Sequence, residues 1–154
     1  MNTIRDIAMV LSAALAPITA IVALSLAYAQ HRLEKVKVRQ QLYERRLAIF
    51  SSTMHLLAMV MRDANVQTAD LFKFSRETDQ SYFLLGKDIT DYLDEIYKKG
   101  IDLYCQTQTQ QNSSLPVAEE RTRLAEQKGE LLKWFERQIL VAREKFAPHL
   151  RLDK

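Results

Sequence analysis

The chain has 154 residues, of which 47% are apolar and 27% charged, with only three Gly, three Pro and one Cys. This length suits one compact domain, or one small domain with an appendage. Because β-sandwiches and barrels need turn residues at short intervals, so little Gly and Pro argues against them. The single cysteine, Cys105, excludes an intramolecular disulfide framework and a Cys-rich zinc site. The net charge of +3 is too small to indicate nucleic-acid binding, and no nucleic-acid partner is expected.

The apolar residues concentrate near the N-terminus. Residues Ile7–Ala29 form a run of 23 residues without a charge. As an α-helix this run measures about 34 Å, which exceeds the roughly 30 Å hydrocarbon core of a bilayer. The rest of the chain is charged and amphipathic. The sequence therefore predicts one transmembrane helix, with residues 1–29 as an anchor and residues 30–154 as a cytosolic domain.

Two features bear on the processing and orientation of this segment. Ala27-Tyr28-Ala29 fits the small-residue rule for cleavage, so a cleaved signal peptide is the alternative to an anchor. The run is longer than the usual apolar core of a signal peptide, and a basic cluster follows it at once. That cluster comprises Arg32, Lys35, Lys37, Arg39, Arg45 and Arg46. By the positive-inside rule it places the N-terminus outside and the C-terminal domain in the cytoplasm, where its side chains can contact anionic headgroups.

Beyond the anchor the sequence predicts an all-α fold, an antiparallel helical bundle. No Gly or Pro occurs between Pro17 and Gly86, so the membrane helix can continue into the cytoplasm. Asn65 and Thr68 can end it and cap the next helix, and Pro116 can open the last one. The string "QTQTQQNSS" (residues 106–114) is typical of a solvated loop. The expected helices span about residues 32–63, 69–78, 88–106 and 116–147.

Apolar residues at helical spacing predict the buried face of each long helix. In the first helix these positions are Val36, Tyr43, Leu47, Phe50, Met54, Leu57 and Met61. In the helix after Gly86 they are Ile89, Leu93, Ile96, Gly100 and Leu103, and in the last helix Leu124, Leu131, Phe135, Ile139, Ala142 and Phe146. The adjacent aromatic pairs Tyr82–Phe83 and Trp134–Phe135 predict one ring of each pair in the core.

Small residues follow one face of the predicted span. They are Ala13, Ala16, Ala20, Ala23 and Ala27, at alternating steps of three and four. In lipid, small-residue faces let helix backbones approach closely, so this stripe predicts self-association, although an alanine-rich segment also gives such a stripe by chance. Ser12 and Thr19 add polar positions that an oligomer could turn inward, which suggests a pore-forming alternative.

Patterns for catalysis and metal binding are weak. The three histidines, His31, His55 and His149, are scattered and share no helical spacing. Four carboxylates lie close together in sequence on one predicted helix: Asp88, Asp91, Asp94 and Glu95. They could hold a divalent cation, but without a second acidic helix a solvated helix face explains them better. No cofactor and no metal ion is expected.

One pair of residues loosely resembles a catalytic signature. Arg143 and His149 have a spacing similar to the Arg-to-His motif of HEPN-type ribonucleases, in which both residues project from a helix into a dimer cleft. Pro148 departs from that pattern, because a proline there breaks the helix before the histidine. A ribonuclease is therefore the least favoured interpretation.

Four strings of the cytosolic part carry a broader resemblance. They are "YERRLAIF" (Tyr43–Phe50), "YFLLGKDITDYLDEIYKK" (Tyr82–Lys99), "ELLKWFERQ" (Glu130–Gln138) and "KFAPHL" (Lys145–Leu150). In this order they resemble small uncharacterised bacterial single-pass membrane proteins with a cytosolic helical domain. The resemblance implies an inner-membrane location and brings no reaction or catalytic residue with it.

These features together predict a non-enzymatic, membrane-anchored helical interaction module. Its expected partners are membrane lipid, a second copy of the chain through the span, and a cytosolic protein. The alternative is an oligomeric membrane effector, or a pore-forming component of a bacterial defence or toxin system.

Overall fold

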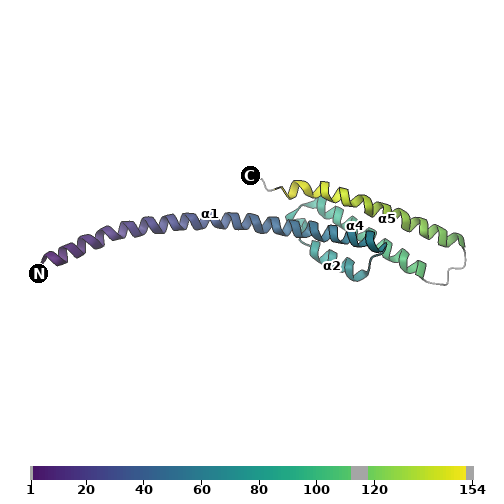
Figure 1. Cartoon of the computed structure of the whole chain (residues 1–154), viewed down its shortest axis with the longest axis horizontal. Coiled ribbons are helices and arrows are strands. Elements are labelled where there is room, and N and C mark those ends of the chain that lie inside the picture. Colours follow the sequence, from purple (N-terminus) through teal and green to yellow (C-terminus); the bar gives the residue numbers. More distant parts are fainter. Residues whose placement is uncertain (1, 112–117, 152–154) are drawn as a thin grey trace. The chain divides into compact units, whose positions relative to one another are not determined.

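The computed structural model describes the backbone of residues 2–111 and 118–151 (Figure 1). It leaves out the side chains of residues 2–20, 22, 29, 32, 33, 35, 111 and 118–120. Every regular element in the described ranges is helical, which confirms the predicted all-α class. The elements are α1 (Asn2–Asp63), α2 (Thr68–Thr78), α3 (Ser81–Leu84), α4 (Lys87–Gln111), α5 (Ala118–Phe146) and the 3₁₀ turn η1 (Ala147–His149).

Contacts divide the chain into two compact units. Unit 1 is Met1–Gln41 and unit 2 is Leu42–Lys154. Unit 1 contains the N-terminal part of α1, and unit 2 contains the rest of α1 and all the other helices. The predicted boundary, between residues 29 and 30, marked the end of the charge-free run. The structural boundary marks the point from which α1 packs with other helices.

The N-terminal part of α1 carries uncovered apolar side chains. Ile21, Leu24 and Leu26 are 68, 73 and 59% exposed. Within the residues whose side chains are described, we find no helix with an apolar stretch long enough to cross a bilayer. The larger part of the predicted span, residues 7–20, lies outside those residues.

Unit 2 has its own hydrophobic core. α4 and α5 lie antiparallel to one another, with α1 and the short helices against them (Figure 1). Side chains from three helices are fully or almost fully buried: Leu57 and Val60 of α1, Ile96 and Leu103 of α4, and Phe135, Ala142 and Phe146 of α5. The rings of Phe50 and Phe146 lie 5.3 Å apart. A helical bundle is therefore confirmed, and the predicted inner faces of α4 and α5 supply much of its core.

The predicted inner face of α1 is only partly right. Val36 is 61% exposed, because it precedes the part of α1 that packs with other helices. The residues that face the core most closely are Ile49, Thr53, Leu56, Leu57 and Val60. The hydroxyl of Thr53 donates to the Ile49 carbonyl oxygen at 2.9 Å, so its own helix satisfies it. A polar residue can therefore occupy the core, which an apolar pattern cannot reveal.

The turn between α1 and α2 differs slightly from the predicted one. Ala64 adopts a left-handed conformation with φ of 48°, and α1 ends just before it. Gln67, rather than Thr68, is the N-cap residue of α2, and its backbone carbonyl accepts bonds from Asp70 N and Leu71 N at 3.1 and 3.2 Å. The prediction that Thr68 caps α2 was therefore off by one residue.

α4 is longer than predicted. The Gln/Thr string expected as a loop is helical as far as Gln111, and Thr107 within it is buried. Gln is a good helix former, and packing of α4 against α5 offsets the unfavourable propensity of Thr. Earlier in α4, Gly100 lies against α2: a Cβ there would stand 2.5 Å from Leu71 Cδ2. The missing side chain at Gly100 therefore lets Leu71 of α2 pack closely against α4.

Candidate functional site

Three segments of unit 2 meet at Arg46. Its Nε donates to the Leu84 carbonyl oxygen at 3.0 Å, and its Nη1 donates to the His149 carbonyl oxygen at 3.4 Å. Because a guanidinium carries five donors in one plane, a single side chain can join α1 to both α3 and η1. We call the region made by residues 42–46, α3 with Lys87, and η1 the α3 end. Arg46, predicted to contact headgroups, is half-buried here and hydrogen-bonded inside unit 2.

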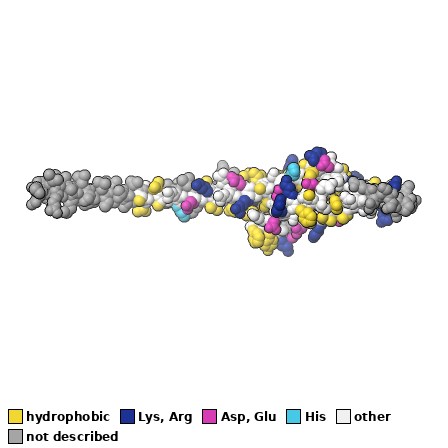
Figure 2. All heavy atoms as spheres, turned by 90° about the horizontal axis from the view of Figure 1, so that it is seen from below, with side chains coloured by type: hydrophobic (Ala, Val, Ile, Leu, Met, Phe, Trp, Pro, Cys, Tyr) yellow, Lys and Arg dark blue, Asp and Glu magenta, His cyan; other side chains and the backbone are white. Residues whose placement is uncertain are grey.

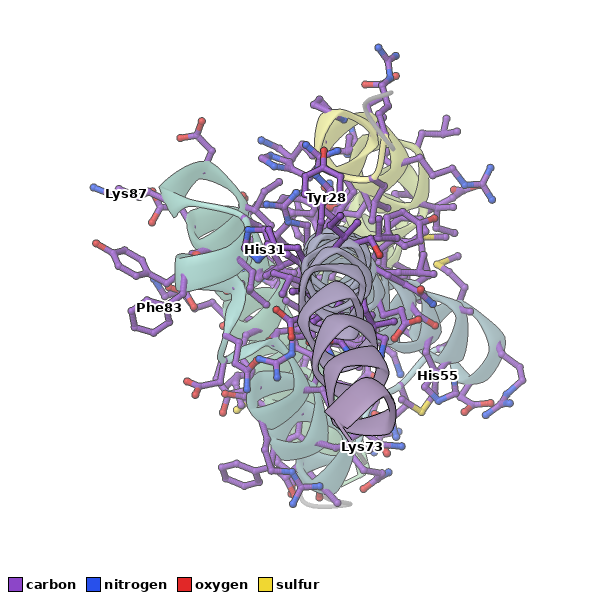
Figure 3. The ribbon with its side chains drawn as sticks, turned by 90° about the vertical axis from the view of Figure 1, so that its left-hand side faces the viewer. Tyr28, His31, His55, Lys73, Phe83 and Lys87 are labelled. Carbon is purple, nitrogen blue, oxygen red and sulfur yellow. The ribbon has the colours of Figure 1, made fainter. Side chains whose placement is uncertain are left out.

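Two aromatic side chains are exposed at the α3 end. Tyr82 is 60% and Phe83 85% exposed, and their rings lie edge to face with centroids 5.5 Å apart. The prediction that one of these rings enters the core is wrong. α3 is a single turn, and Ser81 and Leu85, four residues apart, occupy its inner side. Phe83 and Lys87 both point outward from one side of the bundle (Figure 3).

Charged side chains of both signs surround the α3 end. The cationic residues on or next to its segments are Arg45, Arg46, Lys87, Lys145 and Arg151, and the carboxylates are Glu44, Asp79, Asp88 and Glu144. All except Arg46 are exposed. The Lys145 ammonium lies 5.4 Å from the centre of the Tyr92 ring, whose hydroxyl donates to the Gln138 carbonyl oxygen at 3.2 Å. The α3 end therefore combines exposed aromatic rings with charged side chains of both signs.

The other aromatic pair follows the prediction. Phe135 is fully buried, whereas Trp134 is half-buried at a centroid distance of 5.1 Å. Trp134 lines an open groove of about 850 Å³ between α4 and α5. Cys105, a free and exposed thiol, lines the same groove, as does Gln106, whose buried Oε1 has no hydrogen-bond partner in the described part of the chain. Three cations and three carboxylates line the groove, so its charge favours no ligand class.

The predicted acidic face of α4 is a solvated surface. Asp88, Asp91, Asp94 and Glu95 are all exposed. The described side chains include no group of three or more potential metal ligands that could hold an ion. Tyr92 lies between these carboxylates in sequence, and burial, followed by the nearby Glu95 charge, raises its pKa. The buried tyrosine serves as a packed hydrogen-bond donor.

The histidines and Arg143 are dispersed over the described structure. His31 and His55 are exposed, and His149 is half-buried at the end of η1. His55 lines a shallow groove between α1 and α2, where Ser52 Oγ donates to Glu77 Oε2 at 2.7 Å. That bond engages the serine with a carboxylate rather than with the imidazole. Arg143 is exposed in the last turn of α5, which ends at Phe146 before Pro148, as the sequence predicted.

The predicted membrane-facing residues divide into two sets. Ala13, Ala16, Ala20, Arg32 and Lys35 lie outside the residues whose side chains are described. Ala23, Ala27, Lys37, Arg39 and Arg45 are exposed. Figure 2 shows exposed hydrophobic side chains on unit 2 as well, lying among charged ones.

Comparison with known proteins assigns no family: no family model, no curated protein and no solved structure matches the chain.

Proposed function

We propose that the protein is a non-enzymatic, membrane-anchored helical interaction module that self-associates through its N-terminal helix. The observation that carries this proposal is the set of uncovered apolar side chains at Ile21, Leu24 and Leu26. They lie in the C-terminal part of a stretch that is free of charge from residue 7 to residue 29. A helix that is apolar on all sides requires lipid or protein around it. A bilayer supplies that environment over the full length of the stretch.

Charge supports one orientation of this anchor. Lys37, Arg39 and Arg45 are exposed and follow the apolar stretch within two to five helical turns. Positive residues on the C-terminal side of a single span retain that side in the cytoplasm. We therefore place the N-terminus outside a bacterial inner membrane and unit 2 in the cytoplasm, where the core of unit 2 allows it to present surfaces to a protein partner.

The alanine stripe supports self-association. Ala23 and Ala27 are exposed on α1, and Ala13, Ala16 and Ala20 continue the same face in the sequence. Lipid provides no hydrophobic drive between helices, so association depends on how closely their backbones approach. A face of alanines permits that approach.

Crosslinking in native membranes tests this proposal. One variant replaces Ala16, Ala20 and Ala23 by Leu, which adds bulk to the stripe while it keeps the segment hydrophobic. The matched control changes Leu11, Ile18 and Val22 to other large apolar residues. We expect the dimer yield to fall several-fold in the first variant only. Equal dimer yields from the two variants would show that the alanine stripe is not the interface. Extraction of the protein from membranes by carbonate would refute the anchor.

A dye-leakage assay addresses the alternative of a pore-forming effector. Ser12 and Thr19 lie within the apolar stretch, so an oligomer that turned them inward could conduct ions. An interaction module leaves cells polarised when it is expressed. If induction depolarised the cells, and changing both residues to Val abolished this effect, the pore-forming effector would be favoured over the interaction module.

A further inference from the structure

A cavity of about 250 Å³ lies within unit 2, where α2, α3 and α4 meet. Two carboxylates line it, Asp79 directly after α2 and Asp94 on α4, and neither forms an ion pair within the described part of the chain. The cations nearest to its walls in sequence are Arg76, Lys87 and Lys98, which are exposed and line none of them. The walls of the cavity therefore carry negative charge only.

The buried hydroxyl groups of this cavity donate their protons to the protein itself. Thr78 and Ser81 are only 6 and 3% exposed, and Thr78 Oγ1 donates to the Phe74 carbonyl oxygen at 2.8 Å. Because Thr90 Oγ1 donates to the Gly86 carbonyl oxygen at 3.1 Å, Ser81 Oγ is the donor in its 3.3 Å contact with Thr90 Oγ1. A hydroxyl group has one proton, so these oxygens offer a ligand only their lone pairs.

Carboxylates and lone pairs select a ligand that is positively charged and donates hydrogen bonds. An alkylammonium group meets both conditions, since it has three N–H donors and no acceptor, and it stays charged up to a pH of about 10. A hard metal ion fits less well: Ca²⁺ takes about six to eight oxygen ligands, and no cluster of three or more potential metal-binding side chains occurs among those described.

The remaining walls and the size of the cavity favour a short aliphatic chain. The side chains of Phe74 and Leu93, both almost fully buried, supply apolar surface against which methylene groups can pack. At about 30 Å³ for each water molecule of the liquid, the cavity has room for about eight waters. A molecule of about six to eight non-hydrogen atoms therefore fits, which is the size of a short diamine.

From these observations we propose that the cavity binds a short aliphatic diamine, whose two ammonium groups pair with Asp79 and Asp94. The lone pairs of the buried hydroxyl groups accept further ammonium protons, and the methylene chain lies against the two apolar side chains. Because the walls come from three helices, the bound diamine holds α2, α3 and α4 together. The proposal concerns unit 2 alone and does not depend on the membrane anchor.

Equilibrium dialysis of the full chain in a non-ionic detergent, against radiolabelled butane-1,4-diamine, tests this proposal. We expect one diamine bound per chain. Unlabelled butylamine, which has one ammonium group, should compete about tenfold more weakly, and butane-1,4-diol, which has none, should not compete. Equal competition by butylamine would overturn the assignment of a diamine, and competition by the diol would show that charge does not select the ligand.

Two isosteric variants locate the site. Asp94→Asn should weaken diamine binding about tenfold, whereas Asp91→Asn, at an exposed position of α4 outside the cavity, should leave it unchanged. Urea unfolding without ligand, followed by Trp134 fluorescence, checks that both variants are folded. Equal losses in the two variants would overturn the proposal in favour of general attraction to the acidic face of α4. An absence of binding at millimolar diamine would overturn it outright, and stronger displacement by Ca²⁺ than by butylamine would replace the diamine by a metal ion.

Discussion

Replacing Arg46 by Met tests whether one side chain holds the α3 end together. Methionine keeps an unbranched apolar stem in place but removes both hydrogen bonds, to Leu84 O at 3.0 Å and His149 O at 3.4 Å. A hydrogen bond to a charged group contributes about 1.5–3 kcal/mol, and the longer bond contributes least. We expect the free energy of unfolding to fall by about 2–3 kcal/mol, and Tm by roughly 10 °C.

The measurement follows urea unfolding of the full chain in mild detergent by tryptophan fluorescence. Trp134 is the only tryptophan and lies in unit 2, so its signal does not report the N-terminal helix. Arg45→Met is the matched control, because Arg45 is exposed; it should change stability by less than about 0.5 kcal/mol. Arg46→Lys should fall between the two, since one ammonium cannot reach both carbonyls with the geometry of a guanidinium. If Arg46→Met is no less stable than Arg45→Met, the bonds of Arg46 do not hold the α3 end.

Two further predictions concern the interior of unit 2. Gly129→Ala should raise the free energy of unfolding by up to about 1 kcal/mol, because a Cβ there meets nothing within 4 Å. Gly100→Ala should raise it less, since Leu71 must move to make room for the Cβ. Equal increases for the two variants in urea unfolding would contradict the close approach at Gly100. Tyr92→Phe should cost about 1 kcal/mol at neutral pH through the lost bond to Gln138 O. Because burial raises the Tyr92 pKa, the unfolded chain loses the phenolic proton before the folded chain does as pH rises above about 10. The wild type should therefore lose stability in that range, and Tyr92→Phe should lose less. Parallel profiles of stability against pH for the two proteins would count against this effect of burial.

The sequence predicted the fold class and most of the packing surfaces of unit 2. Ile96, Leu103 and Phe135 recur at helical spacing in strongly amphipathic segments, and all three are buried. The prediction failed where local composition and packing disagreed. Thr107, in a polar string that suggested a loop, is helical and buried, because packing of α4 against α5 decides its state. The prediction for Val36 failed in the opposite sense: this apolar residue was expected to be buried but is exposed, because no other helix covers it.

The α3 end could not be predicted from the sequence for a different reason. Arg46 binds backbone carbonyls, which every residue carries, so no pattern of side chains distinguishes Leu84 and His149 as its acceptors. The exposure of Tyr82 and Phe83 follows from the length of α3, a single turn whose inner side is filled by Ser81 and Leu85. Adjacency indicates only that two neighbouring rings cannot both face one core, so the sequence carries no signal that both Tyr82 and Phe83 are exposed.

The two acceptors of Arg46 also set an order of events during synthesis. Leu84 and His149 follow Arg46 by 38 and 103 residues. The ribosome therefore supplies the first acceptor early, while the second exists only after α5 has been made. Until then a nascent chain can form its early helices but cannot close the end of the bundle nearest to the start of unit 2. Closure at Arg46 therefore follows the synthesis of α5, and a chain truncated before His149 lacks the second acceptor.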